Sequence, residues 1–498
     1  MGDAVNRTIR FLHDGDIVEI DDAAPTRTVL QWLREDRMRC GTKEGCAEGD
    51  CGACMVVVAS LNEDATALDY RAINSCIQFL PTLHGKELIT VENLSPAAGP
   101  LHPVQQALVD CHGSQCGFCT PGFVMTLFAL YKSGAPEARS DIDDALAGNL
   151  CRCTGYRPII DAARRMVSLD RPEGRHAQPH GAATSDAERD AIEALRALNN
   201  DPALHTESQQ GTFAAPTDID AFARLYAAEP NRRILAGGTD VGLWVTKDYR
   251  DIDDVLYIGN VEALRDITVT DSVIDIGAAV TFTELMPVLL EEYPELTDLF
   301  RRWASPPIRN AATLGGNIAN GSPIGDSMPA LIALGTRVLL RHDHDTREID
   351  LESLYIDYQV NDLQPGEFVK RIRIPRRKPG QLVASYKLSK RFDQDISAVC
   401  AAFSAQVEDG QTQHIRIAYG GVAGVPKRAL ATEAALADKP FDEATVRAAM
   451  AVLDDDFSPL TDMRASADYR ATATRNLLYR FFAESTELGA TDVYTYAR

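Results

Sequence analysis

The sequence predicts a multidomain α+β protein in which two small cysteine-rich units precede a longer part that alternates strands and helices. A chain of 498 residues exceeds the size at which a single hydrophobic core usually stops growing, so we expect about three or four domains. Of the eleven cysteines, only Cys400 lies beyond the first third of the chain, which places the predicted metal chemistry near the N-terminus. From Phe213 onward, apolar strand-like segments alternate with amphipathic helix-like segments.

The composition excludes several classes of protein. Hydrophobic residues make up 45% of the chain and charged residues 24%, as in a globular protein. No apolar run approaches the roughly 20 residues that cross a bilayer, and the first residues lack the basic and apolar regions of an export signal. The net charge of -22 argues against nucleic acid as a partner. We therefore expect a cytoplasmic protein that binds neither membrane nor nucleic acid.

The first 95 residues predict a small unit rich in β-strands. Residues 5–20 form two strand-like segments around Asp14-Gly15, a dipeptide typical of a tight hairpin turn. A short amphipathic helix is expected over 28–35, and residues 86–95 close the unit.

Four cysteines in this unit have the spacing of an iron–sulfur protein. Cys46, Cys51 and Cys54 stand in C-x4-C-x2-C order and Cys76 follows them, as in plant-type 2Fe–2S ferredoxins. A zinc ribbon needs two C-x2-C pairs, whereas the fourth cysteine here is single. The spacing therefore favours an iron–sulfur cluster over zinc, and Cys40 is left as a spare thiol.

A second set of four cysteines lies in a predicted helical unit. Cys116 and Cys119 form a C-x2-C pair, Cys151 and Cys153 form a C-x-C pair, and each pair sits in a glycine-containing loop. Thr120-Pro121 is typical of the N-cap and first residue of a helix. Helices are expected over 103–112, 121–132, 140–147 and 158–169. Two such loops can bring four thiolates together, which at this point suits either zinc or an iron–sulfur centre better than unliganded buried cysteines.

Composition shifts divide the chain into five segments. The polar, aperiodic stretch after residue 170 is interpreted as a linker that contains a possible short helix. The predicted segments are 1–95, 96–170, the linker 171–206, 207–378 and 379–498.

Two glycine-rich loops in the fourth segment predict a site for a ligand with two phosphates. The first loop is GGTDVG at 237–242, and the second runs from Ala311 to Ser327 and includes Asn317, Asn320, Ser322 and Asp326. Close-packed backbone N–H groups in such loops suit phosphate oxygens. The first loop is not a Rossmann fingerprint, because its glycines do not follow G-x-G-x-x-G.

The last segment mixes strands and helices and contains a charged stretch from Lys387 to Asp395. This stretch either borders a flavin or forms an exposed loop, and the residues alone leave both interpretations open. Two single-electron centres and a flavin would form a wire that couples to NAD. No further motif supplies a substrate-oxidising site, so we expect the substrate half of the enzyme on a partner chain.

The motifs together resemble one family. GTKEGCAEGDCGAC, QCGFCTPG and GNLCRCTGYRPI are similar to the iron–sulfur region of molybdenum hydroxylases, and LAGGTDVG and TLGGNIANGSPIGDS are similar to the FAD domain of that family. The order of these regions resembles the small subunit of the bacterial xanthine dehydrogenases. The resemblance implies a β-grasp ferredoxin domain, a four-helix 2Fe–2S-binding domain, a two-subdomain FAD-binding domain of the vanillyl-alcohol-oxidase (PCMH) type, and an α+β C-terminal domain of the CO dehydrogenase flavoprotein type.

The resemblance also implies which residues hold the cofactors. Each cysteine set would hold one 2Fe–2S cluster, the first with Cys46, Cys51, Cys54 and Cys76 and the second with Cys116, Cys119, Cys151 and Cys153. The FAD pyrophosphate would lie on Ile234, Leu235, Ala236, Gly237, Gly238, Thr239, Asp240 and Val241. The remaining FAD contacts implied are Trp303, Thr313, Gly316, Asn317, Ser322, Ile324, Asp326 and Lys387.

The implied function is electron transfer within a larger enzyme. A molybdopterin-binding partner would oxidise hypoxanthine and xanthine to urate, and this chain would pass the electrons through both clusters and FAD to NAD. The family implies a heterotetramer with two copies of each chain. The same wiring in an aldehyde or nicotinate-type N-heterocycle dehydrogenase, or a stand-alone NADH-dependent iron–sulfur flavoprotein reductase, stays open as an alternative.

Overall fold

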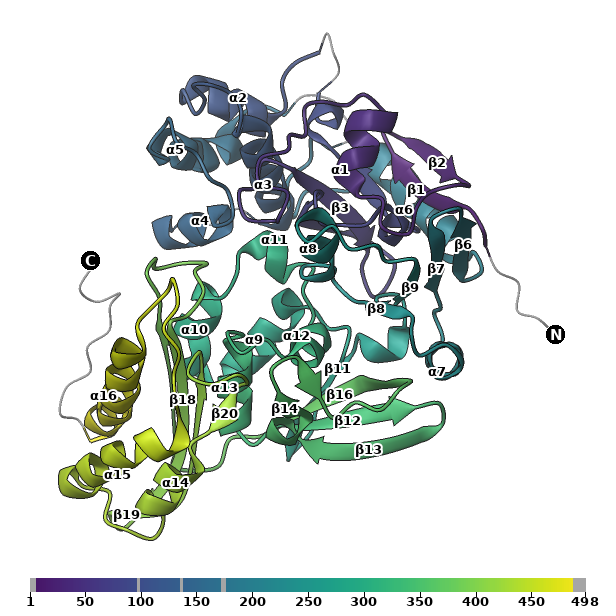
Figure 1. Cartoon of the computed structure of the whole chain (residues 1–498). Coiled ribbons are helices and arrows are strands. Elements are labelled where there is room, and N and C mark those ends of the chain that lie inside the picture. Colours follow the sequence, from purple (N-terminus) through teal and green to yellow (C-terminus); the bar gives the residue numbers. More distant parts are fainter. Residues whose placement is uncertain (1–5, 96–98, 135–137, 172–175, 487–498) are drawn as a thin grey trace.

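The computed structural model describes residues 6–95, 99–134, 138–171 and 176–486. The first third of the chain lies across the top of the molecule, the middle third lies below it, and the C-terminal part lies at the lower left (Figure 1). Within the described residues, each helix is either too short or too polar to span a bilayer. The architecture is a multidomain α+β fold, as the sequence predicts.

The N-terminal sheet has the β-grasp strand order β2-β1-β5-β3-β4. Its central strands β1 and β5 run parallel, and the other neighbours are antiparallel. The turn between β1 and β2 has φ of 57° at Asp14 and 90° at Gly15, the left-handed pair that a tight hairpin requires. The strands are β1 (Ile9–His13), β2 (Asp16–Ile20), β3 (Met55–Leu61), β4 (Leu68–Asn74) and β5 (Glu87–Ile89).

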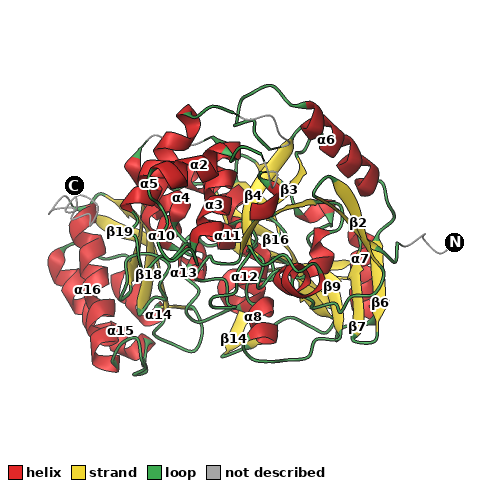
Figure 2. Ribbon diagram, turned by 90° about the horizontal axis from the view of Figure 1, so that it is seen from above, coloured by secondary structure: helices red, strands yellow, loops and turns green. Residues whose placement is uncertain are grey.

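Both faces of this sheet are covered. Successive residues of a strand point to opposite faces, so the contacts of neighbouring residues show what covers each face. Val56 of β3 packs in the same cluster as Val29 and Trp32, which belong to α1 (Val29–Gln31) and the π-helical turn that continues it (Trp32–Asp36). Its neighbour Val57 packs in a cluster with residues of α3 (Thr120–Ser133) and α6 (Asp186–Asn199). Helix α6 lies within the segment expected to be a linker, and its apolar face joins the core of the first sheet (Figure 2).

Four helices form the second unit, close to the ranges that the sequence predicts. They are α2 (Pro103–Asp110), α3, α4 (Arg139–Leu146) and α5 (Arg157–Arg165), and a 3₁₀ turn (Met166–Ser168) follows α5. The N-cap of α3 is Cys119 rather than the predicted Thr120, and the Cys119 side chain makes no capping hydrogen bond. The predicted helix start is therefore one residue late, because a cysteine occupies the cap position.

Helix α2 begins at a buried histidine whose protonation state is fixed by its contacts. His102 Nδ1 accepts a hydrogen bond from the backbone N–H of Val104 (3.2 Å), and Nε2 lies 3.1 Å from the carbonyl oxygen of His176. The ring packs edge-on against Phe128 and Tyr131. Burial lowers the pKa of His102 from 6.5 to about 4. The neutral imidazole, with its proton on Nε2, thus serves as the helix cap.

We expect His102 to make the protein sensitive to acid. Because its folded pKa lies below the unfolded value, the unfolded chain takes up the proton first, and stability is lost as the pH falls from about 6.5 toward about 4. The loss is about 3 kcal/mol for this one group. In His102→Gln, the melting temperature should therefore depend less steeply on pH across this window. His344→Gln, at an exposed histidine, is the control, and an unchanged slope in His102→Gln contradicts the assignment.

Two sheets form the middle part of the chain. The smaller sheet has the order β6-β7-β9-β8, and the larger has the order β10-β11-β16-β12-β13. The strands of the smaller sheet, with the helices beside them, are β6 (Leu204–Ser208), β7 (Gly211–Ala215), α7 (Ile219–Ala228), β8 (Arg233–Leu235), α8 (Val241–Thr246) and β9 (Asp254–Tyr257). The strands of the larger sheet are β10 (Ile267–Val269), β11 (Val273–Gly277), β12 (Arg337–His342), β13 (Asp345–Asp350) and β16 (Glu367–Pro375).

Helices and a small hairpin fill the space around the larger sheet. The helices between β11 and β12 are α9 (Phe282–Glu292), α10 (Thr297–Arg302), α11 (Pro306–Arg309), α12 (Leu314–Asn320) and α13 (Ser327–Ala333). The hairpin pairs β14 (Tyr355–Asp357) with β15 (Val360–Asn361). Together the two sheets give the two-subdomain arrangement that the resemblance implies.

The C-terminal part is an antiparallel sheet in the order β17-β18-β19-β20, with helices on both faces. Along β18, Val399, Ala401 and Phe403 pack against α14 to α16, while Cys400 and Ala402 join the core that contains α13. The elements are β17 (Gln381–Leu388), β18 (Val399–Glu408), β19 (Gln411–Gly420), β20 (Lys427–Arg428), α14 (Leu430–Leu436), α15 (Glu443–Asp456) and α16 (Ala467–Ser485).

Candidate functional site

The four cysteines of the first set converge in one loop region beside β3 and β4. The backbone N–H of Cys51 donates to Cys46 Sγ (3.3 Å), and the Sγ atoms of Cys54 and Cys76 lie 3.2 Å apart. The pKa of the Cys46 thiol is lowered mainly by a hydrogen bond with Cys51 and also by one with Cys76. Hydrogen bonds with Cys46 and Cys54 raise the pKa of the Cys76 thiol. Cys54 and Cys76 are buried, whereas Cys46 and Cys51 are partly exposed.

The loop between these cysteines depends on glycine at two positions. Gly49 and Gly52 have φ of 79° and 72°, which other residues rarely adopt. A Cβ on Gly52 would lie 2.3 Å from the carbonyl oxygen of Gly148. Glycine is required at 52 because the loop passes directly against the helical unit there.

The second cysteine set lies at the starts of α3 and α5 and is more exposed. The pKa of the Cys116 thiol is lowered mainly by a hydrogen bond from the backbone N–H of Phe118, and to a smaller extent by one with the Cys153 thiol. Burial and then the Cys151 thiol raise the pKa of Cys119 to about 12. The thiols therefore approach as two pairs, Cys116 with Cys153 and Cys119 with Cys151.

Two polar residues that the sequence reasoning missed support Cys151. Its backbone N–H donates to Tyr156 Oη (3.0 Å), and its Sγ lies 3.2 Å from Thr154 Oγ1. Tyr156 has a φ of 69°, an unusual conformation for a bulky residue. The threonine and tyrosine of the C-x-C-T-G-Y run were the sequence feature that indicates these contacts, because a hydroxyl group so close to a thiol can hydrogen-bond with it.

The paired arrangement fits two binuclear clusters. A 2Fe–2S cluster takes four thiolates, two at each iron, and both sets supply two close pairs. No group of three or more histidine, cysteine, aspartate or glutamate side chains among the described residues is arranged to hold a single metal ion. The two close thiol pairs of each loop region match a binuclear cluster, in which each iron takes two thiolates.

A direct backbone contact joins the two cysteine sets. The N–H of Leu150, the residue before Cys151, donates to the carbonyl oxygen of Cys51 (3.0 Å). A Cβ on Gly122 of α3 would lie 2.1 Å from the carbonyl oxygen of Gly52, so the first loop also touches the helix that Cys119 caps. Cysteines about 100 positions apart in the sequence are therefore held on adjoining backbone.

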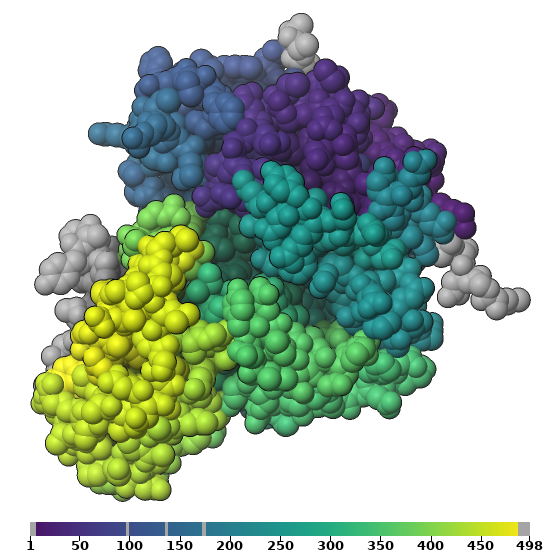
Figure 3. Space-filling view, in the orientation of Figure 1, coloured from purple at the N-terminus to yellow at the C-terminus, as the bar shows by residue number. Residues whose placement is uncertain are grey.

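A cavity with a volume of about 1050 Å³ lies between the two sheets of the middle part. In the space-filling view, the molecule is hollowed where the teal segment with α8 faces the green segment with β14 (Figure 3). Twelve of the sixteen predicted FAD contacts line this cavity. They are Ile234, Ala236, Gly237, Gly238, Thr239, Asp240, Val241, Trp303, Thr313, Gly316, Asn317 and Ser322.

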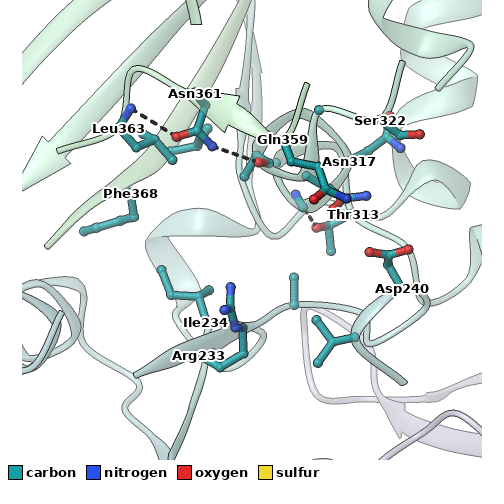
Figure 4. Close-up of a pocket in the computed structure, with 18 of the residues that line it drawn as sticks. Arg233, Ile234, Asp240, Thr313, Asn317, Ser322, Gln359, Asn361, Leu363 and Phe368 are labelled. Atoms are coloured by element: carbon teal, nitrogen blue, oxygen red, sulfur yellow. Dashed lines mark hydrogen bonds between the residues drawn. The ribbon is translucent and has the colours of Figure 1, made fainter. Parts of the chain in front are cut away.

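The cavity wall near α8 and α12 carries polar side chains, of which Asn317 and Ser322 can donate to a phosphate, whereas the Asp240 carboxylate accepts hydrogen bonds. Thr313 caps α12 by accepting from the N–H of Gly316, and Asp240, Asn317 and Ser322 lie around the same space (Figure 4). A Cβ on Gly237 would lie 1.8 Å from the carbonyl oxygen of Ala311, so only glycine fits where the two loops meet. The two glycine-rich loops predicted from the sequence therefore form one wall of one cavity.

Four predicted residues lie away from the cavity lining. Leu235 is buried in the core beneath the smaller sheet, because strand residues alternate in direction and its neighbours face the cavity. Ile324 is partly buried and does not line the cavity. Asp326 and Lys387 instead form a buried ion pair, in which Lys387 Nζ also donates to the carbonyl oxygen of Asp395 (2.6 Å) and to Ser397 Oγ (2.9 Å).

Several lining residues carried no recognisable motif. Arg233 and Trp244 lie on the α8 side, with the Arg233 guanidinium 4.9 Å from the centre of the Trp244 ring. Gln359 of the β14–β15 hairpin and Phe368 of β16 complete the opposite wall (Figure 4). These residues come from separate elements whose approach depends on sheet packing rather than on sequence spacing.

One end of the cavity adjoins the first cysteine set. Leu243 and Ile308 line the cavity and pack against the buried cluster of Leu30, Cys54, Cys76 and Ile77. Thr246 Oγ1 donates to the carbonyl oxygen of Ala47 (2.8 Å), the residue after Cys46. Apolar side chains therefore lie between the buried thiols of Cys54 and Cys76 and this end of the cavity, which is the end that adjoins the first cysteine set.

The charged stretch Lys387–Asp395 runs from the end of β17 into the loop before β18. Arg302 Nε donates to the carbonyl oxygen of Phe392 (2.9 Å), and its guanidinium lies 4.5 Å from the centre of the Phe392 ring. Burial raises the pKa of Asp50, which lies between Cys46 and Cys51, and Arg391 opposes this shift. Residues 390–393 of this stretch are exposed and none of residues 387–395 lines the cavity, which agrees with the interpretation as an exposed loop.

Comparison with protein families matches four successive parts of the chain. Residues 11–80 match the 2Fe–2S iron–sulfur cluster binding domain, and residues 90–164 match the 2Fe–2S binding domain. Residues 206–377 match the FAD binding domain in molybdopterin dehydrogenase, and residues 384–485 match the CO dehydrogenase flavoprotein C-terminal domain. These matches support the iron–sulfur and FAD cofactors.

Individual relatives agree with the domain matches. The chain is 31% identical to xanthine dehydrogenase of Emericella nidulans over 95% of its own length and 38% of that protein. It is also 31% identical to xanthine dehydrogenase of Drosophila subobscura, over 87% of the chain and 36% of that protein. The chain therefore spans less than two fifths of the length of these relatives.

A solved structure matches about half of this chain. Carbon monoxide dehydrogenase from Hydrogenophaga pseudoflava superposes with a TM-score of 0.51 and 27% identity, covering 54% of this chain and 94% of that chain. The superposition therefore supports the fold of about half of this chain.

Proposed function

Because the chain belongs to the molybdenum hydroxylase family, whose iron–sulfur and FAD-binding domains it carries in one polypeptide, we propose that it is the electron-transfer component of a xanthine dehydrogenase. In this proposal a large molybdopterin-binding partner oxidises hypoxanthine and xanthine to urate, and NAD accepts the electrons from this chain. Two copies of each chain form the working enzyme, which operates in the cytoplasm.

One observation carries the proposal: the two cysteine sets and the cavity are joined by direct contacts. Leu150 N–H bonds to the carbonyl oxygen of Cys51 between the sets, and Ile308 packs against the Cys54–Cys76 cluster at the cavity end. When bound, 2Fe–2S clusters carry single electrons and FAD couples single-electron transfer to hydride transfer. Three adjoining redox sites of this kind would carry electrons from one end of the chain of sites to the other.

The residues of this chain hold and orient the cofactors. The two thiol pairs of each set supply the four ligands of a cluster, with Tyr156 and Thr154 supporting Cys151. At the cavity, Gly237 and its neighbours would present backbone to the FAD pyrophosphate, with Asn317 and Ser322 of the second glycine-rich loop around the same space. The second cysteine set is the more exposed one, which supports its placement toward the partner.

The direct test uses the complex purified without air from its native host. Addition of xanthine should bleach the flavin and iron–sulfur absorbance, and NAD should then restore it. Bleaching by NADH but not by xanthine would keep the electron-transfer role and move the substrate to another member of the family. Bleaching by neither would contradict the proposal.

A second candidate is the same role with an aldehyde or a nicotinate-type N-heterocycle as substrate. The match to a carbon monoxide dehydrogenase favours keeping it, because that relative shows the shared flavin-binding half with another substrate. A stand-alone NADH-dependent reductase is the third candidate. Co-purification of a molybdenum-bearing chain supports the first two candidates and excludes the third.

A further inference from the structure

A buried arginine at the end of α11 holds three backbone carbonyl groups. Arg309 is 9% exposed, and its Nη1 donates to the carbonyl oxygens of Arg301 (3.2 Å), Trp303 (3.0 Å) and Ala304 (3.0 Å). Among the described residues, Arg309 forms no ion pair. Burial of a cation that forms no ion pair costs free energy. The three hydrogen bonds to carbonyl groups therefore have to offset that cost.

The segment that Arg309 holds, residues 301–304, contacts the other parts of the molecule. Arg301 pairs with Asp144 of α4 in the helical unit. Arg302 reaches the C-terminal part through the carbonyl oxygens of Phe392 and Lys387. The short segment therefore contacts both the helical unit and the C-terminal part.

The third residue of the segment is the aromatic wall of the cavity. Trp303 lines the cavity and packs on Phe282 with ring centres 3.9 Å apart. The next residue, Ala304, has a φ of 50°, a left-handed conformation that is uncommon for alanine. Such a conformation persists only where surrounding contacts hold it, and two of the three Arg309 hydrogen bonds are made to Trp303 and Ala304.

We propose that Arg309 is a positioning residue for Trp303: by binding the carbonyl groups of the 301–304 segment, it fixes the indole at the end of the cavity that takes the flavin ring. The inference rests on the proposed function, because it requires FAD in this cavity. That end is chosen because Ile308, the residue before Arg309, packs beside Ile77 and the buried thiols of Cys54 and Cys76.

A double-mutant cycle tests this role with readouts other than activity. Deflavo-protein of wild type, R309M, W303A and the R309M/W303A double variant is titrated with FAD, and the visible circular dichroism of the bound flavin is recorded. R309M should weaken FAD binding about tenfold and change the dichroism, while the same substitution in the W303A background should have little further effect. R309K keeps the charge and the N–H donors and should fall between wild type and R309M.

Each outcome supports or overturns the inference. If R309M does not fold, R309K is compared in the two backgrounds instead. Equal effects with and without Trp303, or no effect on either FAD affinity or dichroism, overturn the role of Arg309. Wild-type deflavo-protein that does not bind FAD contradicts the FAD assignment itself, which separates that failure from failure of this inference.

Discussion

In Cys153→Ser, we expect the second cluster to be lost while the first cluster and FAD remain. Cys153 pairs with Cys116, and both thiols are exposed at the surface of the helical unit, so one iron would lose half of its protein ligands. Iron content should fall from about four atoms per chain to about two, since each cluster holds two. Electron transfer from the partner should stop, while NADH should still bleach the flavin.

The measurements are iron and FAD content of the purified variant, and bleaching by xanthine and by NADH in turn. Cys40→Ser is the matched control, because Cys40 is also an exposed thiol but lies outside both sets. A Cys153→Ser enzyme with full iron content and normal turnover would show that Cys153 is not a ligand.

The second large effect is expected in Asp326→Ala. This change leaves the Lys387 ammonium buried with only the Asp395 carbonyl oxygen and the Ser397 hydroxyl as partners. Removal of one member of a buried ion pair costs about 3–5 kcal/mol. Because the pair ties the cavity-forming loop before α13 to the end of β17, FAD content should fall as well, with iron content unchanged.

Urea unfolding and FAD content measured on the same samples check this result. Asn317→Leu is the contrasting variant, since Asn317 lines the cavity and should lower FAD content with a smaller loss of stability (Figure 4). An Asp326→Leu/Lys387→Met double variant should recover much of the stability, because apolar residues can replace a buried ion pair. Wild-type stability in Asp326→Ala would contradict the importance of the pair.

Local signals in the sequence predicted the elements well. The hairpin at Asp14-Gly15 forms with the expected left-handed residues, and the four helices of the second unit lie close to their predicted ranges. These features depend on residues a few positions apart, where backbone preferences act directly. The start of α3 was placed one residue late because a cysteine at the cap position carries no capping signal.

For the sites, some residues were predictable from the sequence and others were not. Cysteine spacing predicted both cysteine sets, and the two glycine-rich loops predicted the cavity wall. Close approach of the backbone requires glycine at Gly52 in the first cysteine loop and at Gly237 in the cavity wall. The same polarity that drew attention to Asp326 placed it among the cavity contacts, whereas the structure pairs it with Lys387, 61 positions later. A buried charge needs a partner, and the partner was too far along the chain to be read from spacing.

By itself, the sequence determined the kinds of ligand that this protein offers: thiols in two spaced sets, and glycines at the two loops of one cavity. Only the tertiary structure decided which thiols pair, that Leu150 bonds to Cys51 across the two units, and that Ile308 joins the cavity to the first set. The physical reason is that ligand type and local turns follow from neighbouring residues. Distances between redox sites instead follow from the packing of whole units, which no local pattern records.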